Sequence, residues 1–189
     1  MSSLRSPEPV KLIIGMFSPR RESFAPVAVQ LADAFGAFDM ISPWMPFDQT
    51  DYYAAEMGGP LFRRMVAFAA PMDPGRLPAV KRFCHDLEQT LMAGAGRSVN
   101  IDPGYLNRSR FVLATGKDFT HRIYIGESVY ADLTLVVAAG RLSPLPWTYP
   151  DYRQPAMLRF LERARSKYLE DLAGRRRGQA RPTDEKENP

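Results

Sequence analysis

The order of short apolar runs and helical stripes constrains this chain most. Twice along the chain a strand-length apolar run is followed by an amphipathic stripe and then by another short run. Apolar residues three and four apart are typical of a helix packed on one side, and short apolar runs bounded by Pro or Gly are typical of buried strands. The predicted order is β-α-β-β-α-β, with strands at 10–17, 38–44, 62–70 and 98–102 and helices at 24–35 and 74–93.

This order is that of the split βαβ, or ferredoxin-like, arrangement, in which two helices cover one face of an antiparallel sheet. Three more strands are expected at 111–115, 121–125 and 129–138, and a last helix from Pro155. The predicted class is α+β: a ferredoxin-like β-α-β-β-α-β core, extended by a three-stranded antiparallel meander and a C-terminal helix. We expect a single domain over 10–173, between a flexible arm at 1–9 and a basic, disordered tail at 174–189.

The charge balance argues against a dedicated nucleic-acid binder. The net charge is +4, but residues 174–189 hold five basic and three acidic residues, so half of the excess lies in the tail. A nearly neutral body is not the basic surface that a polyanion requires. We therefore expect no specific nucleic-acid partner beyond weak contacts of the tail.

Two further features indicate a cytoplasmic protein without a membrane partner. The chain has one cysteine, Cys84, which excludes an internal disulfide framework. The apolar run near the start, 12–17, is too short for a signal segment, and no run approaches the ~20 apolar residues that span a bilayer.

The first candidate site follows the expected strand at 98–102. The Pro after Asp102 restricts that residue to an extended conformation, which predicts a carboxylate at the end of the strand, with Tyr105 beside it. Asp102 could bind a metal, orient a base or hold a ligand hydroxyl. The alternative is an ordinary turn in which Asp102 accepts nearby backbone amides and Tyr105 packs.

The second candidate site joins two expected strands and contains Lys117, His121 and Arg122. Histidine titrates near neutral pH, so His121 could act as a general acid or base, and the two cations could bind phosphate or carboxylate. The alternative is structural, because hairpin register places Arg122 opposite Asp132, where the pair would form a cross-strand salt bridge.

The third candidate segment interleaves aromatic and charged side chains: Trp147, Tyr149, Asp151 and Arg153. Such a loop could stack a base or a sugar, or it could fix the last helix on the sheet. A basic turn before the first helix contains Arg20, and cations beside a helix N-terminus suit an anion.

Strand direction allows these segments to be sorted. If the second and fourth strands run the same way, the acidic and basic segments lie at opposite ends of the sheet. The acidic end would suit a divalent cation held by Asp51 and Asp102, and the basic end an anionic ligand. The acidic set is Asp48, Asp51, Glu56, Asp102 and Glu127, and the basic set is Arg20, Arg21, Lys117, Arg122 and Arg153.

Several of these segments also carry a resemblance to a known family. The matching pieces are 11–15 with Ser18, 50–53, 56–58, 100–106, 113–118, 121–124, 134–135 and 147–153. With them the chain resembles a bacterial family of cytoplasmic proteins, the domain-of-unknown-function family 4416, over roughly 10–170. The resemblance implies no particular activity. Its motif positions coincide with Asp102, Lys117, His121 and Asp151, which favours a functional role for these residues.

Together these patterns predict a protein that binds a small anionic ligand bearing phosphate or carboxylate, with nucleotides among the candidates and with acid/base chemistry as an option. The alternative is a non-enzymatic module that contacts RNA or a protein partner. The residues leave open whether the protein is an enzyme, and they make no prediction of oligomeric state. A divalent cation is the candidate cofactor. The expected acid/base residues are His121 and Asp102, and the expected binding residues are Lys117, Arg122, Tyr105, Trp147, Tyr149, Asp151, Arg153 and Arg20.

Overall fold

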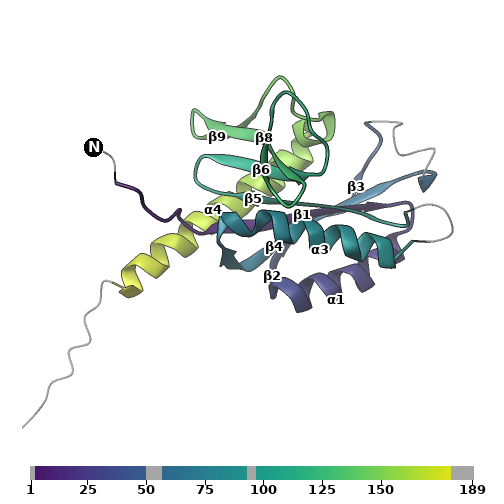
Figure 1. The fold of residues 1–189 in the computed structure, drawn as a ribbon, viewed down its shortest axis with the longest axis horizontal. Coiled ribbons are helices and arrows are strands. Elements are labelled where there is room, and N and C mark those ends of the chain that lie inside the picture. Colours follow the sequence, from purple (N-terminus) through teal and green to yellow (C-terminus); the bar gives the residue numbers. More distant parts are fainter. Residues whose placement is uncertain (1–2, 50–56, 93–96, 180–189) are drawn as a thin grey trace, which may run out of the picture.

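The computed structural model describes residues 3–49, 57–92 and 97–179. Within these residues the chain is an α+β protein with a large antiparallel sheet and three α-helices, one of them C-terminal (Figure 1). The elements are β1 (Val10–Ser18), η1 (Arg21–Ser23), α1 (Phe24–Phe35), β2 (Phe38–Ile41), β3 (Met45–Pro46), β4 (Phe62–Met72), η2 (Pro74–Arg76), α3 (Leu77–Thr90), β5 (Asn100–Leu106), β6 (Arg110–Thr115), β7 (Arg122–Gly126), β8 (Val129–Ala138), β9 (Arg141–Pro144), η3 (Pro150–Arg153) and α4 (Pro155–Gln179).

The strands form one sheet in the order β2-β4-β1-β5-β6-β8-β7, with β3 beside β4 and β9 beside β8. The later strands therefore continue the core sheet, but the expected meander is wrong in its order, because β8 and not β7 lies beside β6. The long strand β8 buries side chains such as Leu135 and gains neighbours on both sides. The shorter β7 exposes Ile123 and Tyr124, as suits an edge strand.

The β7–β8 hairpin has the expected register at Arg122 and Tyr124, but Gly126 and not Ile125 lies opposite Val129, so the expected three-residue turn is wrong. Its turn residues Glu127 and Ser128 both have positive φ values, 54° and 60°, the backbone of a tight two-residue hairpin turn. Arg122 lies opposite Asp132, as predicted.

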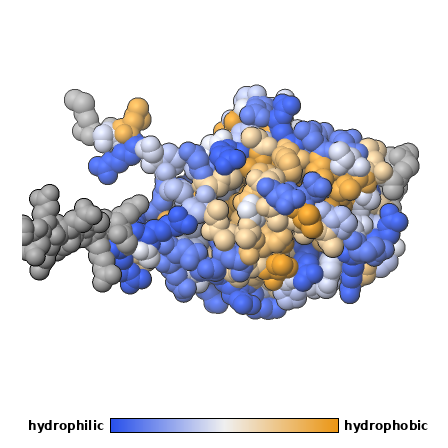
Figure 2. Space-filling view, turned by 90° about the horizontal axis from the view of Figure 1, so that it is seen from below, coloured by the Kyte–Doolittle hydropathy of each residue, from blue (hydrophilic) through white to orange (hydrophobic). Residues whose placement is uncertain are grey.

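Alternate residues of β1 build two apolar cores on opposite faces of the sheet. Leu12 and Ile14 pack with α1 and α3 on one face, and Ile13 packs with α4 on the other. Cys84 of α3 is fully buried in the first core, and burial raises the pKa of its thiol. Helix α1 is apolar even on its outer side, where Val29 is exposed. Figure 2 shows apolar side chains gathered on the side of the molecule that α1 covers.

Helix α4 continues through Gly174 to Gln179, so the first part of the expected tail is helical. Cationic side chains are favourable in the last turn of a helix because of its dipole, and Arg176 there also pairs with Glu8 at 2.6 Å. Residues 180–189 lie outside the described residues. No helix within the described ranges has both the length and the apolar composition needed to cross a bilayer.

The observed strand directions differ from those used to assign the charged segments to opposite ends of the sheet. β1 and β2 are both antiparallel to β4, and β5 is antiparallel to β1. Strands β2 and β5 therefore run in opposite directions, because each helical crossover joins strands that run the same way. The expectation that the second and fourth strands run together is wrong. The ends of β1 and β6 and the starts of β4, β5 and β8 meet at one end of the sheet.

Candidate functional site

The sheet opens between β5 and β6. Their ladder ends where Gly104 pairs with Leu113. Residues two apart in a strand present their backbone polar groups to the same edge. The backbone of Pro103 lies on the edge of β5 that faces β6. Proline has no N–H, so it cannot donate a hydrogen bond to β6. Two residues earlier on this edge, the backbone of Ile101 is bound by α3 instead: its N–H donates to Glu88 and its carbonyl accepts from Lys81.

Gly104 marks the last close approach of the two strands. A Cβ atom at this position would lie 2.4 Å from the carbonyl oxygen of Val112, so a side chain would push the strands apart. The motif 102–104 is therefore no turn, contrary to one sequence interpretation. It lies inside β5 at the point where the sheet splits.

A cleft of about 810 Å³ occupies this opening. One wall consists of β6 and the start of β8, and the other of β5 with the end of β1 and the start of β4. Helix α3 and η3 close the two remaining sides. The expectation of separate acidic and basic ends is wrong, because both signs of charge meet here. The basic residues of the lining are Arg63, Lys81, Arg82, Arg97, Lys117 and Arg122, and the acidic ones are Asp86, Glu88, Asp102, Glu127, Asp132 and Asp151.

Arg63 of β4 is the central buried cation of the cleft. Its guanidinium carbon lies 5.4, 4.6 and 5.1 Å from the ring centroids of Phe17, Phe47 and Tyr152. Rings at these distances stabilise a cation through their quadrupoles. Phe17 is also the cross-strand partner of Arg63 on β1. The rings therefore fix the guanidinium at the junction of β1, β4 and η3.

Two carboxylates complete the surroundings of Arg63. Asp151 of η3 forms an ion pair with it, and Asp102 of β5 lies 3.5 Å from its Nη2 atom. Asp102 is also 3.7 Å from the ammonium of Lys81. Within the described part of the chain, Nε of Arg63 has no hydrogen-bond acceptor. Sequence reasoning missed Arg63, although a charged residue two positions before the buried Met65 is in phase with the apolar face of β4.

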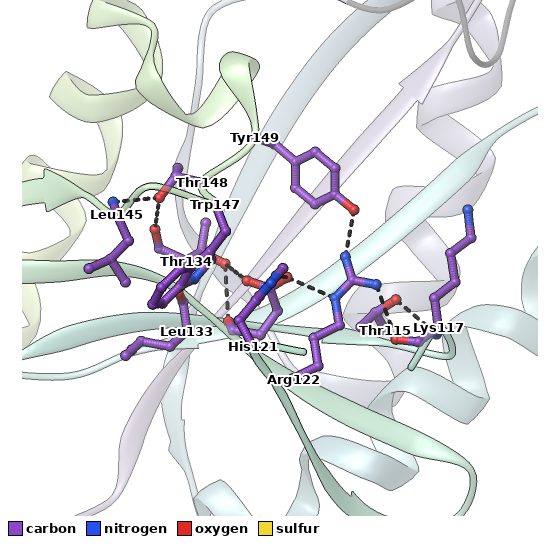
Figure 3. Close-up of polar contacts among 11 residues, drawn as sticks. Thr115, Lys117, His121, Arg122, Leu133, Thr134, Leu145, Trp147, Thr148 and Tyr149 are labelled. Carbon is purple, nitrogen blue, oxygen red and sulfur yellow. Dashed lines mark hydrogen bonds and ion pairs between the residues drawn. The ribbon is translucent and has the colours of Figure 1, made fainter. Parts of the chain in front are cut away.

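The guanidinium of Arg122 connects three segments at the mouth of the cleft by hydrogen bonds (Figure 3). Its Nε donates to Asp132 at 3.0 Å, Nη1 to the carbonyl of Lys117 at 3.0 Å and Nη2 to the hydroxyl of Tyr149 at 2.6 Å. The structural alternative for Arg122, a cross-strand pair with Asp132, is thus confirmed. Because all three nitrogens are engaged, Arg122 holds the Lys117 turn and the Tyr149 ring in place.

His121 and Trp147 lie behind this network (Figure 3). Nε2 of His121 is 3.2 Å from Oδ2 of Asp132, and its ring stacks on Trp147 with the centroids 5.2 Å apart. The indole N–H of Trp147 donates to the carbonyl of Leu133 at 2.8 Å. Neither residue lines the cleft. His121 is connected to it by its contact with Asp132, which does line the cleft.

Glu88 of α3 is a buried carboxyl in the cleft wall that sequence reasoning also missed. Burial raises its pKa to about 7, while Lys81 and the N–H of Ile101 act in the opposite direction. Perturbed carboxyls in clefts are candidates for proton exchange. The sequence does carry a signal for its burial: Glu88 directly follows Leu87 and lies four residues after Cys84, on the apolar stripe of α3.

The structure brings five of the expected site residues to the cleft: Asp102, Lys117, Arg122, Tyr149 and Asp151. The other expected residues that the structure describes lie outside the cleft. Tyr105 packs half-buried against the cores on the α3 side of the sheet, and Arg20 is exposed before η1. Arg153 donates to the carbonyls of Leu145, Pro146 and Thr148, and so shapes the loop before η3.

The expected divalent cation has no support within the described residues. There, no group of three His, Cys, Asp or Glu side chains is arranged to hold a metal. Asp102 instead contacts the cations of Arg63 and Lys81. Asp51, the other expected ligand, lies outside the described residues.

Comparison with known proteins gives one match. A family model described as a domain of unknown function, DUF4416, matches residues 8–168. No curated protein and no solved structure matches the chain significantly.

Proposed function

The chain belongs to the DUF4416 family, and from its own side chains we propose that it binds a small molecule carrying one carboxylate or phosphate group in the cleft between β5 and β6. The observation that carries the proposal is the cleft itself. Its volume of about 810 Å³ is in the range of small-molecule sites, and it brings cationic side chains and aromatic rings together.

The charge of the lining favours a singly charged ligand. Asp102 and Asp151 contact Arg63, and Asp132 contacts Arg122. These fixed pairs leave a lining with little net charge, which does not offset the several negative charges of a polyphosphate. A ligand with one anionic group adds only a single negative charge to this lining.

Lys117 and Tyr149 face the ligand at the mouth of the cleft. Lys117 is exposed at the end of the β6 wall, and the partly exposed ring of Tyr149 is held near it by Arg122. The positive charge of a lysine at the mouth attracts an anion into the cleft, and a tyrosine ring can stack on a flat group. The ligand therefore has an anionic part and an apolar or aromatic part.

We also infer that the core around the cleft is ferredoxin-like. The strand order β2-β4-β1-β5, antiparallel throughout, supports this inference, as do the helices that follow the first and third of the core strands.

Binding of a defined panel tests the proposed function. Acetate, benzoate, inorganic phosphate and nucleoside monophosphates are titrated into the full chain by calorimetry, each with and without Mg²⁺. We expect at least one monoanion to bind, and Lys117→Met to weaken its binding about tenfold, which corresponds to about 1.4 kcal/mol from the loss of an attracting charge. Lys167→Met is the matched control, because Lys167 lies on α4 outside the cleft. Absence of binding by the whole panel would overturn the proposal.

A further inference from the structure

One polar corner of the cleft consists of Glu88, Arg97 and Asn100, and is named here the Glu88 corner. Nη1 of Arg97 lies 2.8 Å from Oδ1 of Asn100 and 3.7 Å from Oε2 of Glu88. All three residues line the cleft, and Glu88 and Asn100 are each only 3% exposed. The corner is therefore built into the fold by α3 and the start of β5.

Asn100 holds a buried hydrogen-bond donor to which no described residue offers an acceptor. Its Oδ1 accepts from Arg97, but its buried Nδ2 has no acceptor among residues 3–49, 57–92 and 97–179. A buried donor without an acceptor is unfavourable, so a ligand oxygen at this position would be stabilised. The orphaned amide is an observation independent of the charges in the corner.

Titratable groups face Glu88 from two sides. Lys81 and the neutral thiol of Cys84 lie on its own helix, and the charges of Arg97 and Asp102 act on it from the β5 side. Desolvation outweighs the two cations and keeps the pKa of the carboxyl at about 7. Near neutral pH, Glu88 therefore exchanges between the carboxylate and the acid, and the acid can donate a hydrogen bond.

Resting on the proposed function, we propose that the Glu88 corner binds the ligand's anionic group as a carboxylate, with Asn100 and Arg97 as donors and Glu88 taking up one proton as the carboxylate enters. Protonated Glu88, the Asn100 amide and the Arg97 guanidinium offer donors to both oxygens of a planar carboxylate. A phosphate dianion would add a second charge close to Asp102, which disfavours it.

Titration of the ¹⁵N-labelled full chain with acetate tests this subsite. The readouts are the side-chain amide signal of Asn100 and the backbone amide signal of Ile101, at pH 6 and pH 8, where acetate stays ionised. We expect both signals to move and the affinity to fall about tenfold from pH 6 to pH 8, because the acid form of Glu88 falls by about that factor across a pKa near 7.

Two variants separate Glu88 from general effects of pH. A glutamine at this position can still accept the Ile101 N–H, so Glu88→Gln imitates the acid form. We expect Glu88→Gln to bind acetate equally at both pH values, with the affinity that the unmodified protein has at pH 6. Glu170→Gln removes an exposed carboxylate of α4 outside the cleft and is expected to retain the pH dependence.

Three outcomes would overturn the subsite. In the first, acetate leaves the Asn100 signal unmoved while the panel still binds in a Lys117-dependent way, and then the proposed function stands alone. In the second, phosphate moves this signal and acetate does not. In the third, the ¹³C-carboxyl titration of Glu88 in the unmodified protein has the same midpoint with and without acetate. A higher midpoint with acetate supports the proposal even if Glu88→Gln does not fold.

Discussion

Two buried cations on neighbouring strands, Lys11 of β1 and Arg63 of β4, differ in what surrounds them. Each residue is 3% exposed. Lys11 donates to Asp39 at 2.6 Å and to the carbonyl of Phe68 at 2.9 Å, and the open space beside it measures about 10 Å³. Arg63 keeps one nitrogen without an acceptor in the described chain and borders a cleft of about 810 Å³.

The difference separates a charge that stabilises the fold from a charge that borders the proposed binding site. The partners of Lys11 are β2 and β4, and Lys167 of α4 lies 3.6 Å from Asp39, so the group ties the sheet to a helix with no room for a ligand. The carboxylates beside Arg63 come from η3 and β5, two sides of the cleft. Burial alone does not identify a functional cation, whereas unused donors next to open volume do.

Among the substitutions that test this comparison, Arg63→Met is expected to change the free energy of unfolding most. Methionine keeps contact with the three rings but leaves the carboxylate of Asp151 almost buried without its partner. Removing one member of a buried ion pair costs about 3–5 kcal/mol. We expect that loss in the free energy of unfolding, measured by urea denaturation, together with a loss of ligand binding. A loss below about 1 kcal/mol would mean that Arg63 does not organise the cleft.

The next largest effect concerns Glu88 and depends on pH. Its pKa is raised in the fold from 4.5 to about 7, so its contribution to stability is fully present below pH 4.5 and is lost as the pH rises through 7. Glu88→Gln should therefore unfold with a free energy about 3 kcal/mol higher than the unmodified protein at pH 8, and about equal at pH 4. Urea denaturation at both pH values checks this, and a variant that is less stable at pH 8 would contradict it.

The sequence predicted elements well where the signals are local. The periodicity and the Gly36 stop place the first helix at 24–35, as observed, and β8 covers the expected 129–138. Strand order and direction are tertiary properties. The sequence could not show that β8 would take the place beside β6. The expected common direction of the second and fourth strands is wrong because each helical crossover joins strands that run the same way, so that β5 runs with β4 and opposite to β2.

The residues of the candidate site also divide into those that a local sequence signal reveals and those that depend on tertiary contacts. Of the expected residues that reach the cleft, Lys117, Arg122, Tyr149 and Asp151 lie in or beside connections between strands and helices, where charged and aromatic side chains are conspicuous, and Asp102 lies within β5. Arg63 and Glu88 lie within a strand and a helix at positions whose spacing marks them as buried. Periodicity identifies such a charged residue as an exception but does not reveal its partners, because these come from distant segments.

Lys11→Met tests the other half of the comparison and has a smaller expected effect. Hydrogen bonds that involve a charged group contribute about 1.5–3 kcal/mol, and Lys167 remains close to Asp39 after the change. We expect a loss of about 2 kcal/mol in the free energy of unfolding and unchanged ligand affinity, measured by urea denaturation and calorimetry. A change in affinity would remove the distinction between the two cations.

Tyr149→Phe has the smallest expected effect and tests how far the cleft network extends to its mouth. The hydroxyl accepts from Arg122 at 2.6 Å, but the ring is 47% exposed and Arg122 keeps its bonds to Asp132 and Lys117. Loss of one exposed hydrogen bond should cost about 0.5–1 kcal/mol. Because phenylalanine keeps the ring, affinity should fall less than threefold, by about 0.6 kcal/mol. Tyr124→Phe, on the exposed edge strand β7, is the matched control. Equal effects of the two changes on urea denaturation and on affinity would show that the Arg122 contact adds nothing, and that the organised part of the cleft ends at Arg63.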